Sequence, residues 1–405
     1  MFMEGWKKYK LRDIGTIVGG ATPSTKNVSN YDGDISWITP KDLANHSGRY
    51  ISRGERMISK KGFDSCSCRM LPRNSILFSS RAPIGYVAIA NNELCTNQGF
   101  KSIIPNDNII DSLFLYYLLV YYRPVIENMG SGTTFQEVSG SVMKNIEVNI
   151  PGIDDQKKIV SILSSLDSKI ELNRRINDNL EQQARALFKA WFVDFEPFKD
   201  GKFVDSELGS IPEGWRVVSL GEITKQVAEK VGNREGMTVL SPVNSGELVL
   251  SEEYFTKQVF SKDLSKYLIV NPLSFVYNPA RINIGSIGLN TYDFVGCVSP
   301  VYVVFECEPD YHYFFDFYKR TAEFKEEVAL RAIGGVRQSL GYNDFSLIKT
   351  VYPTHDVVIK FNNIYLKMKD IIIRNNSQND KLASLRDTLL PKLMSGELEI
   401  NSLNI

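Results

Sequence analysis

The chain has 405 residues, of which 43% are apolar and 11% aromatic, and its 47 basic residues balance its 47 acidic ones. A chain of this length and composition can bury more than one core, so we expect two or more domains. The zero net charge argues against a protein that grips nucleic acid unaided, unless its basic residues gather on one face or a partner supplies part of the phosphate contact.

The cysteines and the start of the chain indicate a compartment. Five cysteines leave one unpaired, and no charged-then-apolar leader follows Met1, so we expect reduced thiols in a cytoplasmic protein. The longest apolar stretch, 113–122, has about ten residues, whereas a membrane span needs ~20. It predicts a core helix and no membrane contact.

Residues 1–150 mix short β-rich runs with turn clusters and one helical stretch, at 111–128. The predicted strands are Ile14–Val18, Ser75–Ser80, Tyr86–Ala90, Lys101–Ile104 and Ile146–Ile150. This mixture is typical of an α+β domain with a mostly antiparallel sheet.

The pattern of residues 151–192 predicts a single amphipathic helix. Pro151 opens it, and Asp154 and Asp155 stand where a helix N-terminus favours anions. Its apolar positions are Ile159, Ile162, Leu163, Leu166, Ile170, Ile176, Leu180 and Leu187. At ~1.5 Å per residue the helix is ~55 Å long. A helix of that length needs a partner along it.

The rest of the chain repeats this order. The remaining segments are a linker at 193–214, a β-rich domain at 215–352, a long helix at 353–395 and a tail at 396–405. The second domain has β-rich runs at Leu268–Tyr277 and Val298–Glu306 and a helix near 311–331. The second helix has apolar residues at Phe361, Ile364, Tyr365, Met368, Ile372, Leu382, Leu385 and Leu389. We expect the two stripes to cover each other in an antiparallel coiled coil that joins two tandem α+β domains with pseudo-two-fold symmetry.

Individual residues also repeat, at an offset of about 202. The repeated sets are Glu4-Gly5-Trp6 with Glu213-Gly214-Trp215, Arg81 and Gly85 with Arg281 and Gly285, Gly132 and Gln136 with Gly334 and Gln338, and Pro151 with Pro353. We expect the glycines to serve backbone turns. A duplicated chain suggests that its two halves perform the same kind of function.

Asn173 and Asn375 coincide at this offset, both near the middle of a helix stripe. In an antiparallel pair related by a two-fold axis, equivalent mid-points face each other. We therefore predict an Asn173–Asn375 contact that fixes the register of the helix pair. The alternative is that both amides are solvated on a helix flank.

Catalytic and metal-binding motifs are missing from the sequence. The histidines His46, His312 and His355 stand in unrelated contexts, and Cys66-Ser67-Cys68 has no second cysteine pair for zinc. Neither G-x-x-x-x-G-K-[ST] nor G-x-G-x-x-G occurs. The run 278–281 lacks the second proline and the aromatic residue of an adenine methyltransferase signature. We expect no bond chemistry and no metal site.

Five segments carry a family resemblance. They are Ile150-Pro151-Gly152-Ile153-Asp154-Asp155-Gln156-Lys157-Lys158-Ile159-Val160, Leu166-Asp167-x-Lys169-Ile170, Leu187-Phe188-Lys189-Ala190-Trp191-Phe192, Gly209-Ser210-Ile211-Pro212-Glu213-Gly214-Trp215 and Leu389-Leu390-Pro391-Lys392-Leu393-Met394-Ser395-Gly396. Together they resemble the specificity subunits of type I restriction-modification systems, over essentially the whole chain.

The resemblance implies a non-catalytic subunit that reads double-stranded DNA through two target recognition domains. Each domain would bind one half of a bipartite asymmetric site, and the helices would set the spacer and dock two modification subunits. Restriction subunits would join for cleavage. S-adenosylmethionine, Mg and ATP are then expected only on those partners, with no cofactor on this chain.

The duplication sorts the candidate DNA contacts. Shared residues cannot distinguish two different half-sites, so Arg81, Arg281, Gln136 and Gln338 are expected to contact phosphates or support the fold. Residues that differ are expected to read bases: Lys41 aligns with Val243, Thr133 and Thr134 with Gly335 and Val336, and Phe135 with Arg337. Lys41 and Arg337 suit guanine, Arg337 bidentately. The alternative for each is a solvated surface charge. Asn278 completes the candidate set.

Two other classes of protein stay open. A coiled-coil scaffold would bind proteins through its β-rich domains and would show no salt-dependent binding of DNA. A self-contained DNA methyltransferase or nuclease would need the cofactor loop and the signature that are missing, and would modify DNA without a partner.

Overall fold

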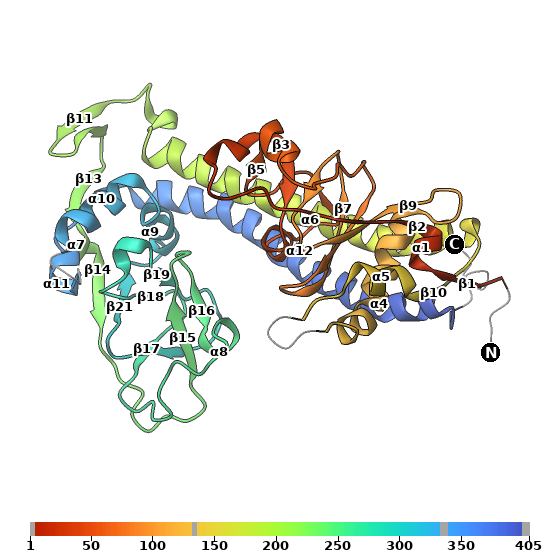
Figure 1. Ribbon diagram of the computed structural model, residues 1–405. Helices are drawn as coiled ribbons and strands as arrows, with labels where there is room; N and C mark the ends of the chain where they lie inside the picture. Colours follow the sequence, from red (N-terminus) through yellow and green to blue (C-terminus); the bar gives the residue numbers. More distant parts are fainter. Residues whose placement is uncertain (1–4, 132–135, 333–338, 399–405) are drawn as a thin grey trace. The chain divides into compact units, whose positions relative to one another are not determined.

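The computed structural model describes residues 5–131, 136–332 and 339–398. The chain divides into two compact units (Figure 1). Unit 1 consists of Met1–Arg175 and Arg374–Ile405, and unit 2 of Ile176–Ile373. The predicted boundaries give each long helix a segment of its own. The structure instead divides both helices between the units, because each helix segment packs on the domain beside it.

Unit 1 is built on a five-stranded sheet in the order β2-β9-β6-β7-β4. Its strands are β2 (Gly15–Gly19), β9 (Lys101–Pro105), β6 (Ile76–Ser80), β7 (Ile84–Ala90) and β4 (Tyr50–Ile51). Neighbours run antiparallel except β4, which is parallel to β7. A smaller sheet joins β5 (Met57–Ile58), β3 (Tyr31–Ile38) and β8 (Cys95–Thr96), and β1 (Lys7–Lys10) pairs with β10 (Glu147–Ile150).

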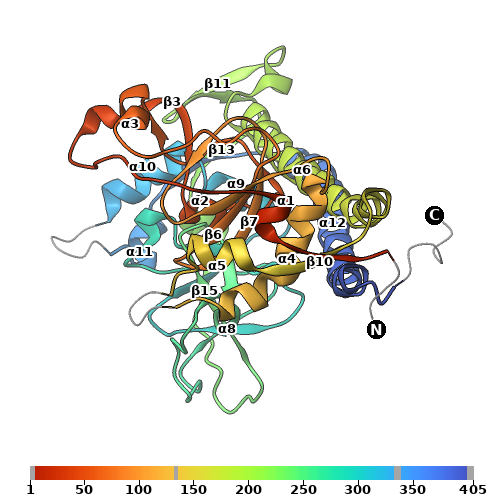
Figure 2. The ribbon, with the colours of Figure 1, turned by 45° about the vertical axis from the view of Figure 1, so that its right-hand side comes forward.

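The helices of unit 1 cover this framework. They are α1 (Leu11–Ile14), α2 (Pro40–Ala44), α3 (Lys60–Asp64), α4 (Ser112–Asn128) and α5 (Gly140–Asn145), with a 3-10 turn at Val28–Asn30. The longest of them, α4, packs on β6 and β7 and buries Phe114, Leu115 and Leu118 (Figure 2). Its first turn is capped by the Asp111 carboxylate, which accepts from two backbone N–H groups.

Unit 2 repeats the same plan. One four-stranded sheet has the order β14-β21-β18-β19 and the other β16-β15-β20-β17. The strands are β13 (Arg216–Ser219), β14 (Thr224–Val227), β15 (Thr238–Pro242), β16 (Leu248–Leu250), β17 (Leu268–Val270), β18 (Phe275–Tyr277), β19 (Ile287–Leu289), β20 (Gly296–Val298), β21 (Val303–Cys307) and β22 (Lys349–Tyr352). The short helices are α7 (Leu220–Ile223), α8 (Ser251–Tyr254), α9 (His312–Tyr318), α10 (Ala322–Arg331) and α11 (Tyr342–Phe345), with a 3-10 turn at Ile282–Ile284.

Strand pairing in each unit shows that the duplication extends to topology. The order β2-β9-β6-β7 in unit 1 matches β14-β21-β18-β19 in unit 2. The terminal pair β1–β10 matches β13–β22, and the parallel pair β3–β8 matches β15–β20. The repeat seen in the sequence is therefore a repeat of the fold.

The strand predictions find five of the ten strands described in the first domain, miss the others, including β3, and fail partly in the second. All five strands predicted before residue 150 are present, displaced by at most two residues at either end. The run Leu268–Tyr277 is instead two strands, because Pro272 has no N–H to donate and Leu273 adopts a φ of 65°. Val298–Glu306 likewise divides into β20 and β21 around Pro300, and the helix near 311–331 divides where Thr321 caps α10.

The segment predicted as a linker is folded. It contains a 3-10 turn at Glu196–Phe198 and a hairpin of β11 (Phe203–Ser206) and β12 (Gly209–Pro212). The rings of Phe195 and Phe198 lie 5.5 and 5.1 Å from Trp215. Its aromatic residues pack on Trp215 and so attach the segment to the second domain.

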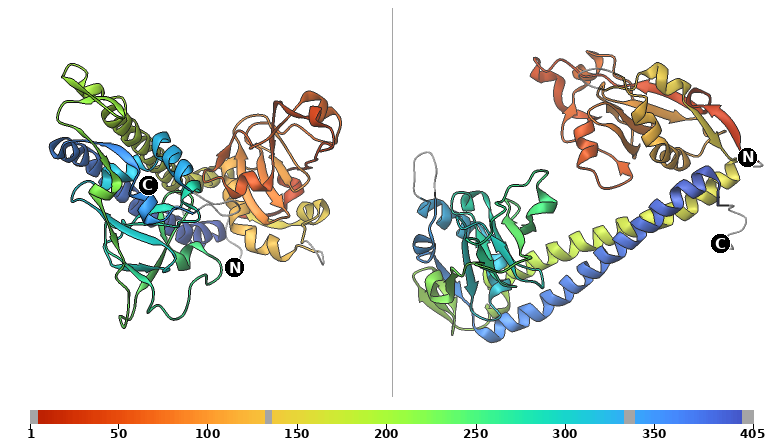
Figure 3. Two further views of the ribbon diagram at one scale, coloured as in Figure 1. Left: turned by 90° about the vertical axis from the view of Figure 1, so that its left-hand side faces the viewer. Right: turned by 90° about the horizontal axis from the view of Figure 1, so that it is seen from below.

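The long helices are α6 (Ile153–Phe192) and α12 (His355–Ser395), each of which begins two residues later than predicted. In unit 1 the two segments are antiparallel: Asp167 bonds to Arg386, and Asn173, further along α6, bonds to Asn379, further back along α12 (Figure 3). In unit 2 the rings of Phe188 and Phe192 contact Phe361. None of the helices in the described part of the chain is long and apolar enough to cross a membrane.

The predicted apolar stripes are wrong at three positions. Ile176, Ile364 and Leu385 are exposed by 37%, 37% and 47%. The predicted positions Ile159, Leu163 and Ile170 are buried, and between Leu163 and Ala184 the buried positions of α6 are Leu163, Asp167, Ile170, Asn173 and Asn177. They follow a seam that repeats about every seven residues, and polar side chains occupy its middle.

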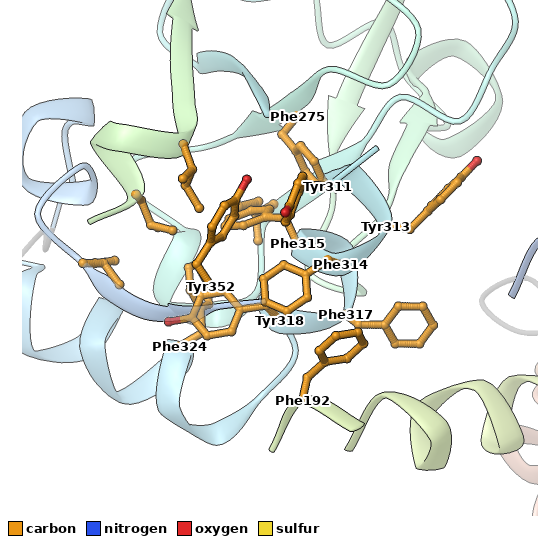
Figure 4. Packing of buried hydrophobic residues seen from close by; sticks show 14 of the residues in the cluster. Phe192, Phe275, Tyr311, Tyr313, Phe314, Phe315, Phe317, Tyr318, Phe324 and Tyr352 are labelled. Atoms are coloured by element: carbon orange, nitrogen blue, oxygen red, sulfur yellow. The ribbon is translucent and has the colours of Figure 1, made fainter. Parts of the chain in front are cut away.

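An aromatic cluster forms the core of unit 2. Phe188 stacks on Phe317 at 5.4 Å, and Phe192 meets Phe314 edge to face at 5.2 Å. Figure 4 shows Phe314, Phe317 and Phe192 close together, with the sheet residue Phe275 above them. The core of unit 1 is aliphatic by comparison, with Ile159 and Leu163 of α6 packed with Leu390 and Leu393 of α12.

Candidate nucleic-acid interface

Arg81 lies in the turn between β6 and β7, where it shares a carboxylate with a second cation. Its Nη1 is 3.4 Å from Glu137 Oε2, and Lys101 Nζ is 3.0 Å from Glu137 Oε1. Lys101 also donates to Ser80 Oγ at 3.3 Å. Two cations and one anion leave a net positive charge at this end of the sheet.

The equivalent turn of unit 2 joins β18 to β19 and carries Asn278 and Arg281. The Asn278 side-chain oxygen accepts from the backbone N–H of Ala280 at 3.0 Å, and its backbone oxygen accepts from Arg281 at 2.9 Å. Asn278 therefore shapes the turn. Arg281 is exposed and has no ion-pair partner within the described ranges. In unit 1 Glu137 pairs with Arg81, whereas no described acidic residue pairs with Arg281.

The two turns are fixed to the chain in the same way. Val138 N–H donates to Ser80 O in unit 1, and Leu340 N–H donates to Pro279 O in unit 2, both at 3.0 Å. Gly85 and Gly285 follow the two turns with φ of 97° and 93°, and a Cβ at Gly285 would lie 2.8 Å from Asn244 O. The residues shared by the halves thus build a common frame.

Several predicted DNA contacts border or belong to segments that the structure does not describe. Gln136 is exposed just before Glu137, at the edge of the described range. Thr133, Thr134, Arg337 and Gln338 lie outside the described residues. Their predicted roles stay predictions.

Lys41 lies in α2 and is exposed, but it is paired. Its Nζ is 2.7 Å from Glu55 Oε2, and this hydrogen bond raises the pKa of Lys41. The helix begins at Thr39, whose N–H and hydroxyl both donate to Asp42. A guanine that binds Lys41 must compete with Glu55 for the ammonium group.

Asn173 is completely buried, and its amide bonds to two residues of α12. Asn173 Nδ2 donates to Gln378 Oε1 at 2.8 Å and to Asn379 Oδ1 at 2.9 Å. Asn379 lies four residues beyond Asn375, which is about one helical turn or ~6 Å. These bonds place a polar contact in the seam of the helix pair one helical turn from Asn375, and the Asn173–Asn375 contact itself stays a prediction.

A buried polar network holds the first domain on the helices. Arg49 forms a two-point contact with Glu171, Nε to Oε1 at 2.9 Å and Nη2 to Oε2 at 3.0 Å. Tyr117 donates to Asp167 at 2.6 Å, and Arg386 donates to the other oxygen of Asp167 at 2.7 Å. The domain, α6 and α12 are thus joined by one chain of charge-assisted hydrogen bonds.

The pKa shifts in this network are those of a fixed ion pair. Burial lowers the pKa of Arg49, but its hydrogen bonds to Glu171 more than offset burial, and the pKa is raised. Burial raises the pKa of Glu171, whereas Arg49 lowers it, and the net shift is downward. The pKa of Tyr117 is raised by burial and then by the charge of Asp167. Both charged partners are therefore held in their ionised forms.

Sequence reasoning missed this network. Arg49 and Glu171 are separated by 122 residues, and neither belongs to a motif. The available signal was Asp167, a carboxylate on the buried face of an amphipathic helix, which needs a partner wherever it lies.

Unit 2 has a buried ion pair of its own. Lys319 is almost completely buried, bonds to Asp316 at 2.7 Å and donates to the backbone oxygens of Gly246 and Ile287. Burial lowers the pKa of Lys319, and Asp316 only partly offsets it. This cation joins elements of the domain to one another, whereas the aromatic cluster joins the domain to α6 and α12.

Cysteine and histidine side chains are the remaining candidates for chemistry. In the described part of the chain, no three His, Cys, Asp or Glu side chains are placed to hold a metal ion. The hydrogen bond to Cys95, followed by burial, raises the pKa of Cys68, so its thiol is unreactive. His355 pairs with Asp310 at 3.0 Å, and both are exposed.

Comparison with known proteins assigns the chain to a family. Residues 3–182 match the type I restriction modification DNA specificity domain. The type I restriction enzyme MjaIX specificity subunit of Methanocaldococcus jannaschii is 37% identical over 98% of this chain and 94% of its own length, and the HindI specificity subunit of Haemophilus influenzae is 24% identical over 98% and 100%. The chain belongs to the specificity subunits of type I restriction enzymes, in which catalysis resides on other subunits.

Solved structures show the same fold. The S subunit of the type I restriction-modification system of M. genitalium superposes with a TM-score of 0.56 at 17% identity and covers 96% of both chains. A chain from a study of the assembly and conformational transition of a type I system gives a TM-score of 0.50 at 15% identity, over 98% of this chain and 100% of that one. Two α+β domains joined by long helices are the architecture of this family, as the sequence predicts.

Proposed function

We propose that each unit reads one half of a bipartite double-stranded DNA site. The observation that carries this proposal is the pair of equivalent turns, fixed by the same backbone bond but surrounded by different charges. Arg81 shares Glu137 with Lys101 in unit 1, whereas Arg281 has no acidic partner in the described part of unit 2. One frame with two sets of side chains suits two half-sites of different sequence.

The spacer between the half-sites would depend on α6 and α12, since both helices contribute a segment to each unit. The same helices offer a surface for two modification subunits. Exposed apolar side chains occur on them at Leu172, Ile176, Ile364, Leu366, Ile371, Ile373 and Leu385, with exposures from 36% to 55%. These apolar side chains lie outside the buried seam of the helix pair, and that seam is itself polar in its middle. Exposed apolar side chains of this kind favour binding of a protein partner.

The modification partners would bring S-adenosylmethionine and perform the methyl transfer. Restriction subunits would add ATP and Mg for cleavage. These assignments rest on the family and on the absence of nucleotide and methyltransferase motifs in the sequence. Such partners would also supply part of the phosphate contact, which suits a chain with zero net charge.

The proposal is tested by methylation of a randomised DNA library with the chain and its modification subunit. We expect methylation only when both proteins are present, at a motif in two parts. Arg337→Gln is expected to relax one position in one part of the motif. Arg331→Gln is the matched control, because Arg331 is paired with Glu327 on α10, and should leave the motif unchanged.

Three results would redirect the proposal. Methylation by the purified chain alone would make it an enzyme. Failure to bind DNA at any salt concentration, even with the modification subunit present, would favour the coiled-coil scaffold. A uniform loss over all sequences in Arg337→Gln would make Arg337 a phosphate contact instead of a base reader.

A further inference from the structure

Unit 1 carries a concentration of positive charge that unit 2 lacks. Residues 53–73 contain six basic and two acidic residues. The corresponding stretch of unit 2, 251–274, precedes β18 as residues 53–73 precede the matching strand β6, and it contains three of each. The zero net charge of the chain therefore conceals a basic segment in one half.

The basic residues of this segment are exposed, and four have no internal partner. Within the described ranges, Arg53, Lys61, Arg69 and Arg73 form no ion pair or side-chain hydrogen bond. The two carboxylates of the segment are already used, Glu55 by Lys41 and Asp64 by Lys60. The positive charge of the four is consequently available to an external anion.

Arg56 differs from these four. Its guanidinium lies 3.6 Å from the centre of the Tyr31 ring, so the side chain is held on the surface of β3.

The segment is held in place by the small sheet of unit 1. Arg53 precedes β5, Lys61 is in α3, and Arg69 follows Cys68, whose thiol donates to Ala21 O at 3.1 Å. Trp37 Nε1 of β3 donates to the same oxygen at 3.1 Å. Figures 1 and 2 show β3, β5 and α3 on the side of unit 1 away from β1 and β10.

We propose that this basic segment is the phosphate-contacting surface of unit 1, and that unit 1 supplies most of the chain's own electrostatic grip on duplex DNA. This inference rests on the proposed function and adds an asymmetry to it: the two half-sites are held with unequal charge. A strand of phosphates is favoured over an acidic protein because Met70 is the only large apolar side chain exposed in this described segment. Protein interfaces need an apolar centre, whereas phosphate contact needs only well-placed cations.

The experiment measures how DNA affinity falls with salt in the full chain bound to its modification subunit. The probes are a duplex that carries the methylated motif and an equally long duplex with that motif scrambled. Each phosphate contact contributes ~0.9 to the slope of log affinity against log salt. The variant Arg53→Gln, Arg69→Gln, Arg73→Gln is expected to lower the slope by about 2 to 3 on both probes.

Two variants serve as controls. Lys257→Gln, Lys262→Gln, Lys266→Gln removes three exposed cations from the equivalent stretch of unit 2 and is expected to change the slope by less than about one contact. Replacing the same three arginines of unit 1 by lysine retains their charge and should retain the slope. Equal melting temperatures of all variants would exclude unfolding as the cause of a changed slope. We expect them to be equal, because the replaced side chains are exposed and their removal leaves no buried group without a partner.

An unchanged slope in the arginine-to-glutamine variant would overturn the inference. So would an equal fall in the unit 2 control, which would remove the asymmetry, or a loss confined to the motif duplex, which would make these residues base readers. If the unaltered complex binds neither probe, the proposed function fails and this inference fails with it.

Discussion

Removal of the contact between Arg49 and Glu171 tests how the first domain is held on the helices. Glu171→Gln keeps the shape of the side chain but removes the charge that two nitrogens of Arg49 approach, at 2.9 and 3.0 Å. The Arg49 side chain is only 7% exposed, so its charge has little access to water, whereas Glu171 is 27% exposed. Removing one partner of a buried ion pair costs about 3–5 kcal/mol, and the partial exposure of Glu171 places this case at about 3 kcal/mol.

The assay is thermal unfolding of the full chain with hydrogen exchange resolved along the sequence. A single free energy does not describe a chain of two units, so the transition of unit 1 is followed separately. For a unit of this size, ~2–4 °C is lost per kcal/mol, which predicts a fall of about 6–12 °C. Amides of unit 1 are expected to exchange sooner, and those of unit 2 to be unchanged.

Glu147→Gln is the matched control in the same unit. Glu147 pairs with Lys8 at 2.5 Å, but both side chains are about half exposed. Exposed pairs of this kind contribute little to stability, so the transition of unit 1 should move by less than ~4 °C. Equal effects of the two variants would refute the reasoning that burial makes the Arg49–Glu171 contact important.

Three further predictions follow from the same structure. Asn173→Ala removes the donor to Asn379, which is itself buried, and should lower the stability of unit 1 by about 1–3 kcal/mol in denaturant unfolding, with unit 2 unaffected. Phe188→Ala leaves a cavity among Phe192, Phe317 and Phe361 and should cost unit 2 about 3–5 kcal/mol in the same measurement; a loss below ~1 kcal/mol would contradict the packing. Because the folded pKa of Glu171 is lowered, its stabilising effect is complete above the ordinary pKa of ~4.3 and is lost as the pH falls through the folded value. Circular dichroism against pH should therefore show extra acid sensitivity in the unaltered chain that Glu171→Gln lacks.

The sequence predicts five strands of the first domain because these strands are marked locally. Apolar alternation between turn residues is enough to place β6 and β10 within one residue. It fails at Leu268–Tyr277, where a continuous β-rich run conceals a turn made by Pro272 and Leu273. Single residues decide such breaks, and a window average does not show them.

The register of the helices lies beyond local patterns. The position of Asn173 predicts a buried polar contact, and the amide is buried and bonded. Its bonded partner Asn379 lies one turn from Asn375, and Tyr117 with Asp167 and Asp167 with Arg386 tie the same helix segments to each other and to the domain. Those partners are distant in sequence, and one sequence contains no signal that joins them.

The candidate DNA contacts are predicted from the duplication and stay predictions, whereas the structure shows how the two turns that carry Arg81 and Arg281 are built. Shared residues such as Gly85 and Gly285 form the turns that support the frame. The charges around those turns differ, as Glu137 beside Arg81 shows. Electrostatic surroundings depend on residues from several elements, so a motif alone does not give them.

Sequencing the methylated bases of the host genome, with and without this gene, tests the central claim most directly. The account predicts that one methylation motif in two parts, separated by a spacer of fixed length, disappears when the gene is removed and returns when it is restored. Loss of a motif in one continuous part, or no change in methylation while an intact modification subunit is expressed, would contradict the account.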